Sequence, residues 1–256
     1  MDRRRGDGSA GDADYGLIGR DYSRYRRPDP WIAARIAEAL GNARSVLNVG
    51  AGAGSYEPTD REVTPVEPSA SMRAQRPLHL PAAVDATADR LPFPDAHFDA
   101  SMTTFSVHQW PDPRAGLTEM RRVTRGPIVI LTCDPDALDR FWLHDYAPEV
   151  TRVEASRYPP LDEIIAALGG SANLREVPIP LDCTDGFNEA YYGRPERLLD
   201  EGARQACSGW SLVPPAIVQR FVDKLGGDLA DGTWDRLYGH FRRLPQFEGP
   251  LRLIVG

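Results

Sequence analysis

Cysteine is scarce in this chain of 256 residues, and no two of its three cysteines have the C-x-x-C spacing. Cys133, Cys183 and Cys207 therefore suggest neither a disulfide framework nor a zinc site, and we expect buried free thiols and no metal. Long apolar runs are also missing: none approaches the ~20 residues of a membrane span, and residues 1–12 lack the apolar centre of a secretory signal. We therefore expect a cytoplasmic protein without a membrane partner.

The chain has no excess of positive charge. Its 30 lysines and arginines are outnumbered by 37 aspartates and glutamates, which gives a formal net charge of −7. Neutralising phosphates requires clustered basic side chains, so we do not expect nucleic acid or an anionic membrane as the main partner. The expected partner is a small molecule, bound by a monomer or a homodimer.

The amino-terminal residues 1–13 have almost nothing to bury, and we expect them to be disordered. The next stretch, residues 15–27, interleaves tyrosines with arginines. Two interpretations stay open for it. It is either a surface helix whose long side chains cover the core, or a flap in which Tyr22 closes over a bound cofactor.

An apolar run leads into glycine at every second position, in the order Val46-Leu47-Asn48-Val49-Gly50-Ala51-Gly52-Ala53-Gly54. A strand that ends in such a loop lets the backbone approach a ligand, because glycine has no Cβ and adopts positive φ. Glu67 ends the next predicted strand, 17 residues after Gly50. In a nucleotide-binding βαβ unit, an acid at this position accepts hydrogen bonds from ribose hydroxyls.

Strands and helices alternate over the first ~135 residues, which favours an α/β fold with a doubly wound, mostly parallel sheet. Asp29-Pro30 has the order that opens a helix, and apolar spacing extends this helix to Gly41. Pro65 cannot donate to a ladder, which confines the second strand to a sheet edge or a bulge. We expect seven strands, at residues 45–49, 63–67, 82–87, 98–105, 127–132, 174–183 and 250–255.

The second half of the chain has a different pattern. Residues 188–246 are largely helical, and this block is longer than a crossover between two strands needs. We interpret it as a cap beside the ligand crevice. The expected organisation is one domain over residues 14–256, with a cofactor-binding core at 14–135, a sixth strand and helical cap at 136–249, and a final strand at 250–256.

Four motifs together resemble the class I S-adenosylmethionine-dependent methyltransferases, in particular their small-molecule branch. They are the glycine loop, Glu67-Pro68-Ser69, Leu91-Pro92-Phe93-Pro94-Asp95 with Phe98-Asp99, and His108-Gln109-Trp110-Pro111-Asp112. The resemblance covers roughly residues 15–135. It implies a Rossmann-like fold with a variable helical cap before the last strand. It also implies methyl transfer from S-adenosylmethionine to an oxygen, nitrogen or carbon of a small metabolite, which leaves S-adenosylhomocysteine.

The resemblance also implies a set of cofactor-binding residues. The glycine loop would carry the methionine end of the cofactor, Glu67 the ribose, and Met72 would pack on the adenine. The adenine edge falls on Thr87 and Ala88, an assignment that is open by two residues in either direction, toward Asp85 or Asp89. The full set is Asn48, Gly50, Ala51, Gly52, Glu67, Met72, Thr87, Ala88, Thr104 and Phe105.

The chain departs from this family at two of these positions. Asn48 and Thr87 stand where the family has aspartate, usually at the first and often at the second. An amide at position 48 still forms hydrogen bonds to the loop, but it removes a charge near the amino group of the cofactor. A dinucleotide is the less favoured cofactor, because Ser55 stands where the G-x-G-x-x-G pattern requires glycine.

His108 is the candidate catalytic base. It follows a predicted parallel strand, where open α/β sheets build their sites, and histidine titrates near neutral pH. In the alternative interpretation His108 packs against Trp110 and orders the turn. Other aromatic and histidine side chains are expected to line the acceptor pocket, although such residues more often belong to the core. The expected pocket residues are Tyr22, Trp110, Trp142, His144, Tyr146 and Tyr191.

Two other functions stay open. In one, the fold binds the cofactor but catalyses an isomerisation or a cyclisation without methyl transfer. In the other, the chain is a regulatory module that binds the cofactor.

Overall fold

The computed structural model describes residues 6–9 and 22–256. Most of the predicted disordered tail, and residues 15–21 of the tyrosine- and arginine-rich stretch, lie outside the described residues. From Tyr22 onward this stretch forms the short helix α2 (Tyr22–Tyr25), followed by an extended segment that leads into helix α3 (Pro30–Leu40). Asp29 caps α3 by accepting the backbone amides of Trp31 and Ile32, as the Asp-Pro order predicted.

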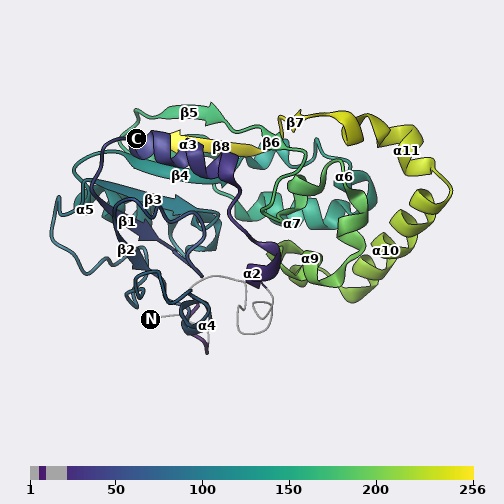
Figure 1. Ribbon diagram of the computed structural model, residues 1–256. Helices are drawn as coiled ribbons and strands as arrows, with labels where there is room; N and C mark the ends of the chain where they lie inside the picture. The colour runs from purple at the N-terminus through teal and green to yellow at the C-terminus, as the bar shows by residue number, and fades with distance from the viewer. Residues whose placement is uncertain (1–5, 10–21) are drawn as a thin grey trace.

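The expected doubly wound α/β architecture is confirmed: the centre of the fold is a six-stranded, mostly parallel sheet with helices on both faces (Figure 1). Its strand order is β2-β1-β3-β4-β8-β5, in which β8 is antiparallel to both of its neighbours and the other neighbouring strands are parallel. The strands are β1 (Ser45–Val49), β2 (Glu62–Val66), β3 (Ala100–Thr104), β4 (Ile128–Cys133), β5 (Asn173–Glu176) and β8 (Leu251–Val255). Strand β2 lies at an edge, as Pro65 required.

Both faces of the sheet are buried, because helices cover each of them. Successive side chains of the central strands point to opposite faces and so pack against different helices. Val46 packs toward α3, whereas Leu47 packs toward the other face with α5 (Pro113–Val123) and α8 (Leu161–Ala167). The continuous apolar run in β4 is fully buried, as expected for a strand covered on both sides.

Two of the seven predicted strands are wrong in detail. Residues 82–87 form a single bridge, in which Val84 pairs with Val66 and exchanges backbone hydrogen bonds with Pro65 and Glu67, and the pairing extends no further along this short segment. The predicted strand at 174–183 is interrupted by Pro178, which has no amide hydrogen to donate. Its first part is β5, and its second part, β6 (Ile179–Pro180), pairs with β7 (Gln246–Phe247) in a separate two-stranded sheet.

The helical cap lies beside the sheet (Figure 1). Its apolar side chains, Trp142 and Trp234 among them, belong to the same buried cluster as α3 and one face of the sheet. Several short 3-10 turns connect its helices, including one at Asn188–Tyr191. The cap helices are α6 (Leu143–Tyr146), α7 (Pro148–Arg157), α9 (Glu201–Gln205), α10 (Pro215–Ala230) and α11 (Thr233–Tyr238).

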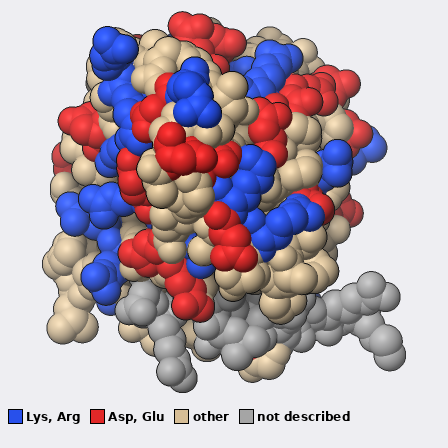
Figure 2. Space-filling view, turned by 90° about the vertical axis from the view of Figure 1, so that its right-hand side faces the viewer, with Lys and Arg blue, Asp and Glu red and all other residues tan. Residues whose placement is uncertain are grey.

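The outer face of the cap carries side chains of both charges, interspersed (Figure 2). Helix α10 contributes two of its ion pairs, Arg220 with Glu149 and Lys224 with Asp228. Among the described helices, none is long and apolar enough to cross a membrane.

Candidate functional site

A crevice opens at the carboxyl ends of β1 and β3, where the strand order of the sheet reverses. It encloses about 880 Å³, its open mouth included. Segments that are far apart in the sequence meet here: the glycine loop, the start of α4 (Ala70–Ala74), residues 86–89, the end of β3 and the turn after it. The predicted residues that line this crevice are Gly50, Ala51, Gly52, Glu67, Met72, Thr87, Ala88, Thr104 and Phe105.

The glycine loop is packed too tightly for side chains. Gly50 and Gly52 have φ angles of 69° and 52°, which only glycine adopts at little cost. A Cβ at Gly50 would collide with the hydroxyl of Ser106, and one at Gly52 would lie 3.2 Å from the Met72 methyl group. The loop is fixed to β2 by the amides of Gly50 and Ala51, which both donate to the Val66 carbonyl at 2.9 Å.

Glu67 joins the glycine loop to the residue that caps α4. One carboxylate oxygen accepts the amide of Gly52 and the other accepts the amide of Ser69, both at 2.8 Å. The side chain is buried yet lines the crevice. Burial raises the pKa of this carboxyl, while the two amides, Arg73 and Arg76 act in the opposite direction. Each oxygen keeps a second lone pair, so a hydroxyl in the crevice has an acceptor.

Asn48 is the one predicted cofactor residue that does not line the crevice. It lies behind the loop, 1% exposed, and its amide nitrogen donates to Glu57 at 3.0 Å. Glu57 in turn forms a buried two-point ion pair with Arg76, whose guanidinium also donates to the Gly52 carbonyl. The Glu57 carboxylate is thus taken up by Asn48 and Arg76 and does not line the crevice.

A second cavity adjoins the crevice and shares Tyr22 and Phe105 with it. Phe105 has a φ of 50°, an unfavourable angle for a bulky residue, and this conformation lets its ring border both spaces. Helices and turns of the cap form most of the remaining wall. The full lining is Tyr22, Arg26, Phe105, His108, Cys133, Leu138, Glu154, Tyr158, Phe187, Asn188, Glu189, Ala206, Cys207 and Ser208.

His108 lines the second cavity. Its ring packs on Tyr158, with centroids 4.4 Å apart. Burial, with Arg157 and Arg26 nearby, holds the pKa of His108 well below its usual value of 6.5. The imidazole is therefore neutral at neutral pH and only weakly basic, which makes it a poorer proton acceptor than its position in the sequence predicted.

Two buried carboxylates face the same cavity. Glu154, from α7, accepts the Gly209 amide at 2.8 Å and pairs with Arg157 at 3.3 Å. Glu189 comes from the 3-10 turn after β6 and is 5% exposed. Burial, reinforced by Glu154, raises the pKa of Glu189 to about 7, against its own backbone amide and Arg26.

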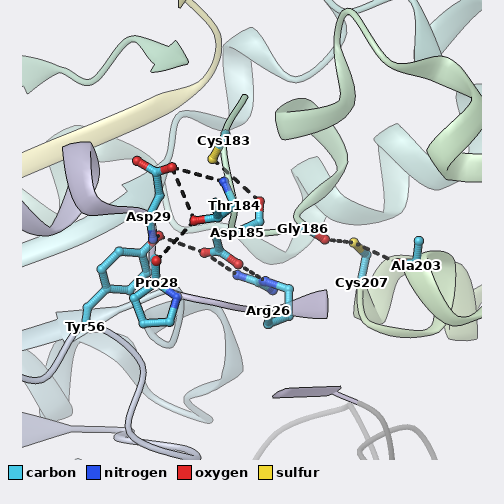
Figure 3. Close-up of polar contacts among 10 residues, drawn as sticks. All are labelled: Arg26, Pro28, Asp29, Tyr56, Cys183, Thr184, Asp185, Gly186, Ala203 and Cys207. Carbon is cyan, nitrogen blue, oxygen red and sulfur yellow. Dashed lines mark hydrogen bonds and ion pairs between the residues drawn. The ribbon is translucent and has the colours of Figure 1, made fainter. Parts of the chain in front are cut away.

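Arg26 lines the same cavity, and Figure 3 shows its side chain directed toward Asp185. Its guanidinium pairs with Asp185 at 2.5 Å and lies 5.0 Å from the centre of the Phe105 ring. The Tyr56 hydroxyl donates to the same Asp185 at 3.0 Å and accepts the Asp29 amide. The extended segment before α3, the loop after Gly54 and the cap are thus joined through one buried carboxylate.

The predicted substrate residues are only partly brought together. Tyr22 lines both cavities, while Trp110 lines the crevice and donates to Ser106 at 3.0 Å. Trp142, His144 and Tyr146 line neither cavity: they lie in the cap and form hydrogen bonds with Tyr192, Thr151 and Asp228 respectively. Tyr191 faces a different hollow, beside Arg194. Trp142 and Tyr146 belong to the buried core that the cap shares with one face of the sheet, which is the more common place for aromatic clusters.

Three lining residues of the second cavity were not predicted: Glu154, Tyr158 and Glu189. They come from α7, the residue that follows it, and a 3-10 turn about thirty positions further on. Only Glu189 gave a signal, as an acid directly before the apolar and aromatic run Ala190-Tyr191-Tyr192. The described residues include no group of histidine, cysteine, aspartate and glutamate arranged to hold a metal ion.

A doubly wound sheet with a glycine-lined crevice at its switch point defines a nucleotide-cofactor-binding α/β protein. Residues 47–127 match the family described as the methyltransferase domain. A demethylmenaquinone methyltransferase of Deinococcus radiodurans is 34% identical over 126 residues, which cover 43% of this chain and 52% of the relative. The match thus spans about half of the length of that protein.

Solved structures extend the likeness to the whole fold. A protein from Anabaena variabilis, assigned as a methyltransferase of an antibiotic biosynthesis pathway, is 30% identical with a TM-score of 0.85, covering 91% of this chain and 99% of its own. The cyclase SpnF shares the fold alone, at 17% identity and a TM-score of 0.50, over 88% of this chain and 79% of its own. The chain belongs to the class I S-adenosylmethionine-dependent methyltransferases.

Proposed function

We propose that this protein transfers the methyl group of S-adenosylmethionine to an oxygen, nitrogen or carbon of a small-molecule acceptor. The observation that supports this function is the pair of adjoining cavities that share Tyr22 and Phe105. One is lined by the glycine loop and a buried acid, and the other by polar and aromatic side chains, most of them from the cap. A donor and an acceptor held in two such spaces are brought together without water, which supplies much of the rate of a bimolecular transfer.

The crevice fits S-adenosylmethionine by its own features. Because Gly50 and Gly52 have no Cβ, a ligand can lie close to the backbone of the loop, and this suits the methionine end of the cofactor. Glu67, Met72, Thr87 and Ala88 all line the crevice. In the proposed complex, Glu67 accepts hydrogen bonds from the ribose hydroxyls, and Met72 packs on the adenine beside Thr87 and Ala88. When bound, the cofactor supplies an electrophilic methyl group on its sulfonium sulfur. The protein positions the acceptor and excludes water.

The relatives favour a small acceptor. By its name, the Deinococcus radiodurans protein acts on demethylmenaquinone, a small molecule, although its match covers about half of that protein. The second cavity, about 570 Å³ with its open side included, is consistent with an acceptor of limited size. We propose a cytoplasmic enzyme that works as a monomer or homodimer, with residues 14–256 as one domain.

Calorimetric titration with S-adenosylmethionine and S-adenosylhomocysteine tests the cofactor assignment. Both should bind and raise the melting temperature, since a ligand of the native state stabilises it. Absence of binding at millimolar ligand would refute the assignment. Substrate turnover without S-adenosylhomocysteine would favour a cyclase or isomerase, and cofactor binding by a chain whose second cavity accepts no ligand would favour a regulatory module.

A further inference from the structure

Glu189 is the charged side chain of the second cavity for which no partner of opposite charge is found among the described residues. Arg26 is neutralised by Asp185, and Glu154 is paired with Arg157. Glu189 is a carboxylate buried to 5% exposure, and among the described residues no lysine, arginine or histidine lies within ion-pair distance of it. A buried carboxylate without a cation is costly to ionise, so the site would gain most from a ligand that supplies one.

We propose that the second cavity binds a compact amine and that Glu189 holds its ammonium group and accepts the proton it must lose before methylation. This inference rests on the proposed function and specifies its acceptor. An ammonium brings the missing positive charge and donors to the carboxylate. The aromatic rings of Phe105, Phe187 and Tyr158 give the wall an apolar surface suited to the carbon part of a small amine.

The transfer balances in atoms and charge. The ammonium gives one proton to Glu189, whose carboxylate becomes a neutral carboxylic acid, and the freed nitrogen lone pair forms the bond to the methyl carbon. The carbon–sulfur bond breaks with its electrons left on sulfur, so the sulfonium becomes a neutral thioether and the positive charge moves to the methylated nitrogen.

The charged and titratable groups around Glu189 determine whether its carboxyl gives up or accepts a proton at neutral pH. The titratable and charged side chains that line the cavity with Glu189 are Glu154, Tyr158, Arg26, His108, Cys133, Cys207 and Tyr22. Burial brings the pKa of Glu189 to about 7, so it is ionised often enough at neutral pH to accept a proton. An anionic acceptor would bring a second negative charge toward Glu189 and Glu154, and it is excluded on that ground.

Three probes of one shape test the charge preference: benzylamine, benzyl alcohol and benzoate. Their binding is measured by ligand-observed NMR on the full chain saturated with S-adenosylhomocysteine. We expect benzylamine to bind about tenfold or more tighter than benzyl alcohol, since a hydrogen bond to a charged group is worth that much. Benzoate should bind weakest. Equal binding of the alcohol and the amine, or preferred binding of benzoate, would overturn the proposal.

The Glu189→Gln variant tests the residue. It keeps the shape of the side chain but removes its charge, so the preference for benzylamine over benzyl alcohol should fall to about twofold or less. Its affinity for S-adenosylhomocysteine should be unchanged, because Glu189 does not line the crevice. Glu248→Gln, at an exposed position after β7, is the matched control and should keep the wild-type preference. A Glu189→Gln variant that keeps the preference would refute the assignment, whereas failure of wild-type protein to bind S-adenosylhomocysteine would refute the proposed function instead.

Discussion

The side-chain amide of Asn48 donates to Glu57 at 3.0 Å, and Arg76 holds the same carboxylate from the other side at 2.7 Å. All three side chains are buried directly behind the glycine loop. An aspartate at position 48, which is usual in this family, would place two carboxylates in contact at this point. An uncharged donor at position 48 therefore suits the buried carboxylate of Glu57, which an aspartate would repel.

Replacing Asn48 by aspartate should destabilise the fold. The Asn48→Asp variant removes a donor and adds a like charge to a buried site, so we expect a loss of about 1 to 3 kcal/mol in the free energy of unfolding at pH 7. Urea denaturation measures it. Adding Glu57→Gln should restore much of the loss, because the glutamine amide can donate to the introduced carboxylate. An Asn48→Asp variant as stable as the wild type would contradict this interpretation.

Glu67 should contribute to cofactor affinity. The Glu67→Ala variant loses an acceptor for the ribose and also the contact that orders the Gly52 amide, so we expect S-adenosylhomocysteine to bind about 1 to 3 kcal/mol more weakly by calorimetry. Glu62→Ala is the matched control, because Glu62 is exposed at the other end of β2. Wild-type affinity in the Glu67 variant would exclude it from the cofactor site.

The cofactor half of the fold could be predicted because its signals are local. The glycines of the loop, Glu67 after a strand and the cap of α3 at Asp29 each act within a few residues of the chain. The strand at 82–87 was overpredicted because a short apolar segment looks the same whether it forms one bridge or a ladder. Pro178, a visible break, should have divided the strand at 174–183.

The lining of the second cavity could not be predicted in this way. Glu189, Glu154 and Tyr158 meet only after the cap has folded, and nothing in their spacing shows which acids end up without a cation. Trp142 and Tyr146 were mistaken for pocket residues because a large aromatic side chain has the same sequence signature in a core as in a binding site.

The ionisation of Glu189 should appear in the pH dependence of stability. The pKa of Glu189 is about 7 in the folded chain, above its usual value of 4.5, so the folded state holds this proton more tightly than the unfolded state. The corresponding stability is fully present below about pH 4.5 and is lost as the pH rises through about 7, by about 3 kcal/mol in all. Urea denaturation from pH 5 to 8 should show wild-type protein losing stability relative to Glu189→Gln. Parallel curves for the two proteins would show that Glu189 titrates normally.

The ion pair between Arg26 and Asp185 should hold the amino-terminal segment on the cap. Both partners are largely buried, and in the Arg26→Met variant Asp185 would keep only neutral partners such as the Tyr56 hydroxyl. We expect a loss of about 3 to 5 kcal/mol in the free energy of unfolding, because an unpaired buried charge is left behind. Adding Asp185→Asn should recover part of this loss, since it removes that charge.

Arg35→Met provides the comparison for an exposed arginine. Arg35 pairs with Glu38 at 3.4 Å on the surface of α3, and such pairs contribute at most about 1 kcal/mol. Chemical denaturation of the wild type and of these variants measures the contrast. If Arg26→Met cost no more than Arg35→Met, or if Asp185→Asn added a further full loss, the buried pair would not be what joins the segment before α3 to the cap. The expected pattern would instead show that a buried charge pair between the segment before α3 and the cap stabilises the fold.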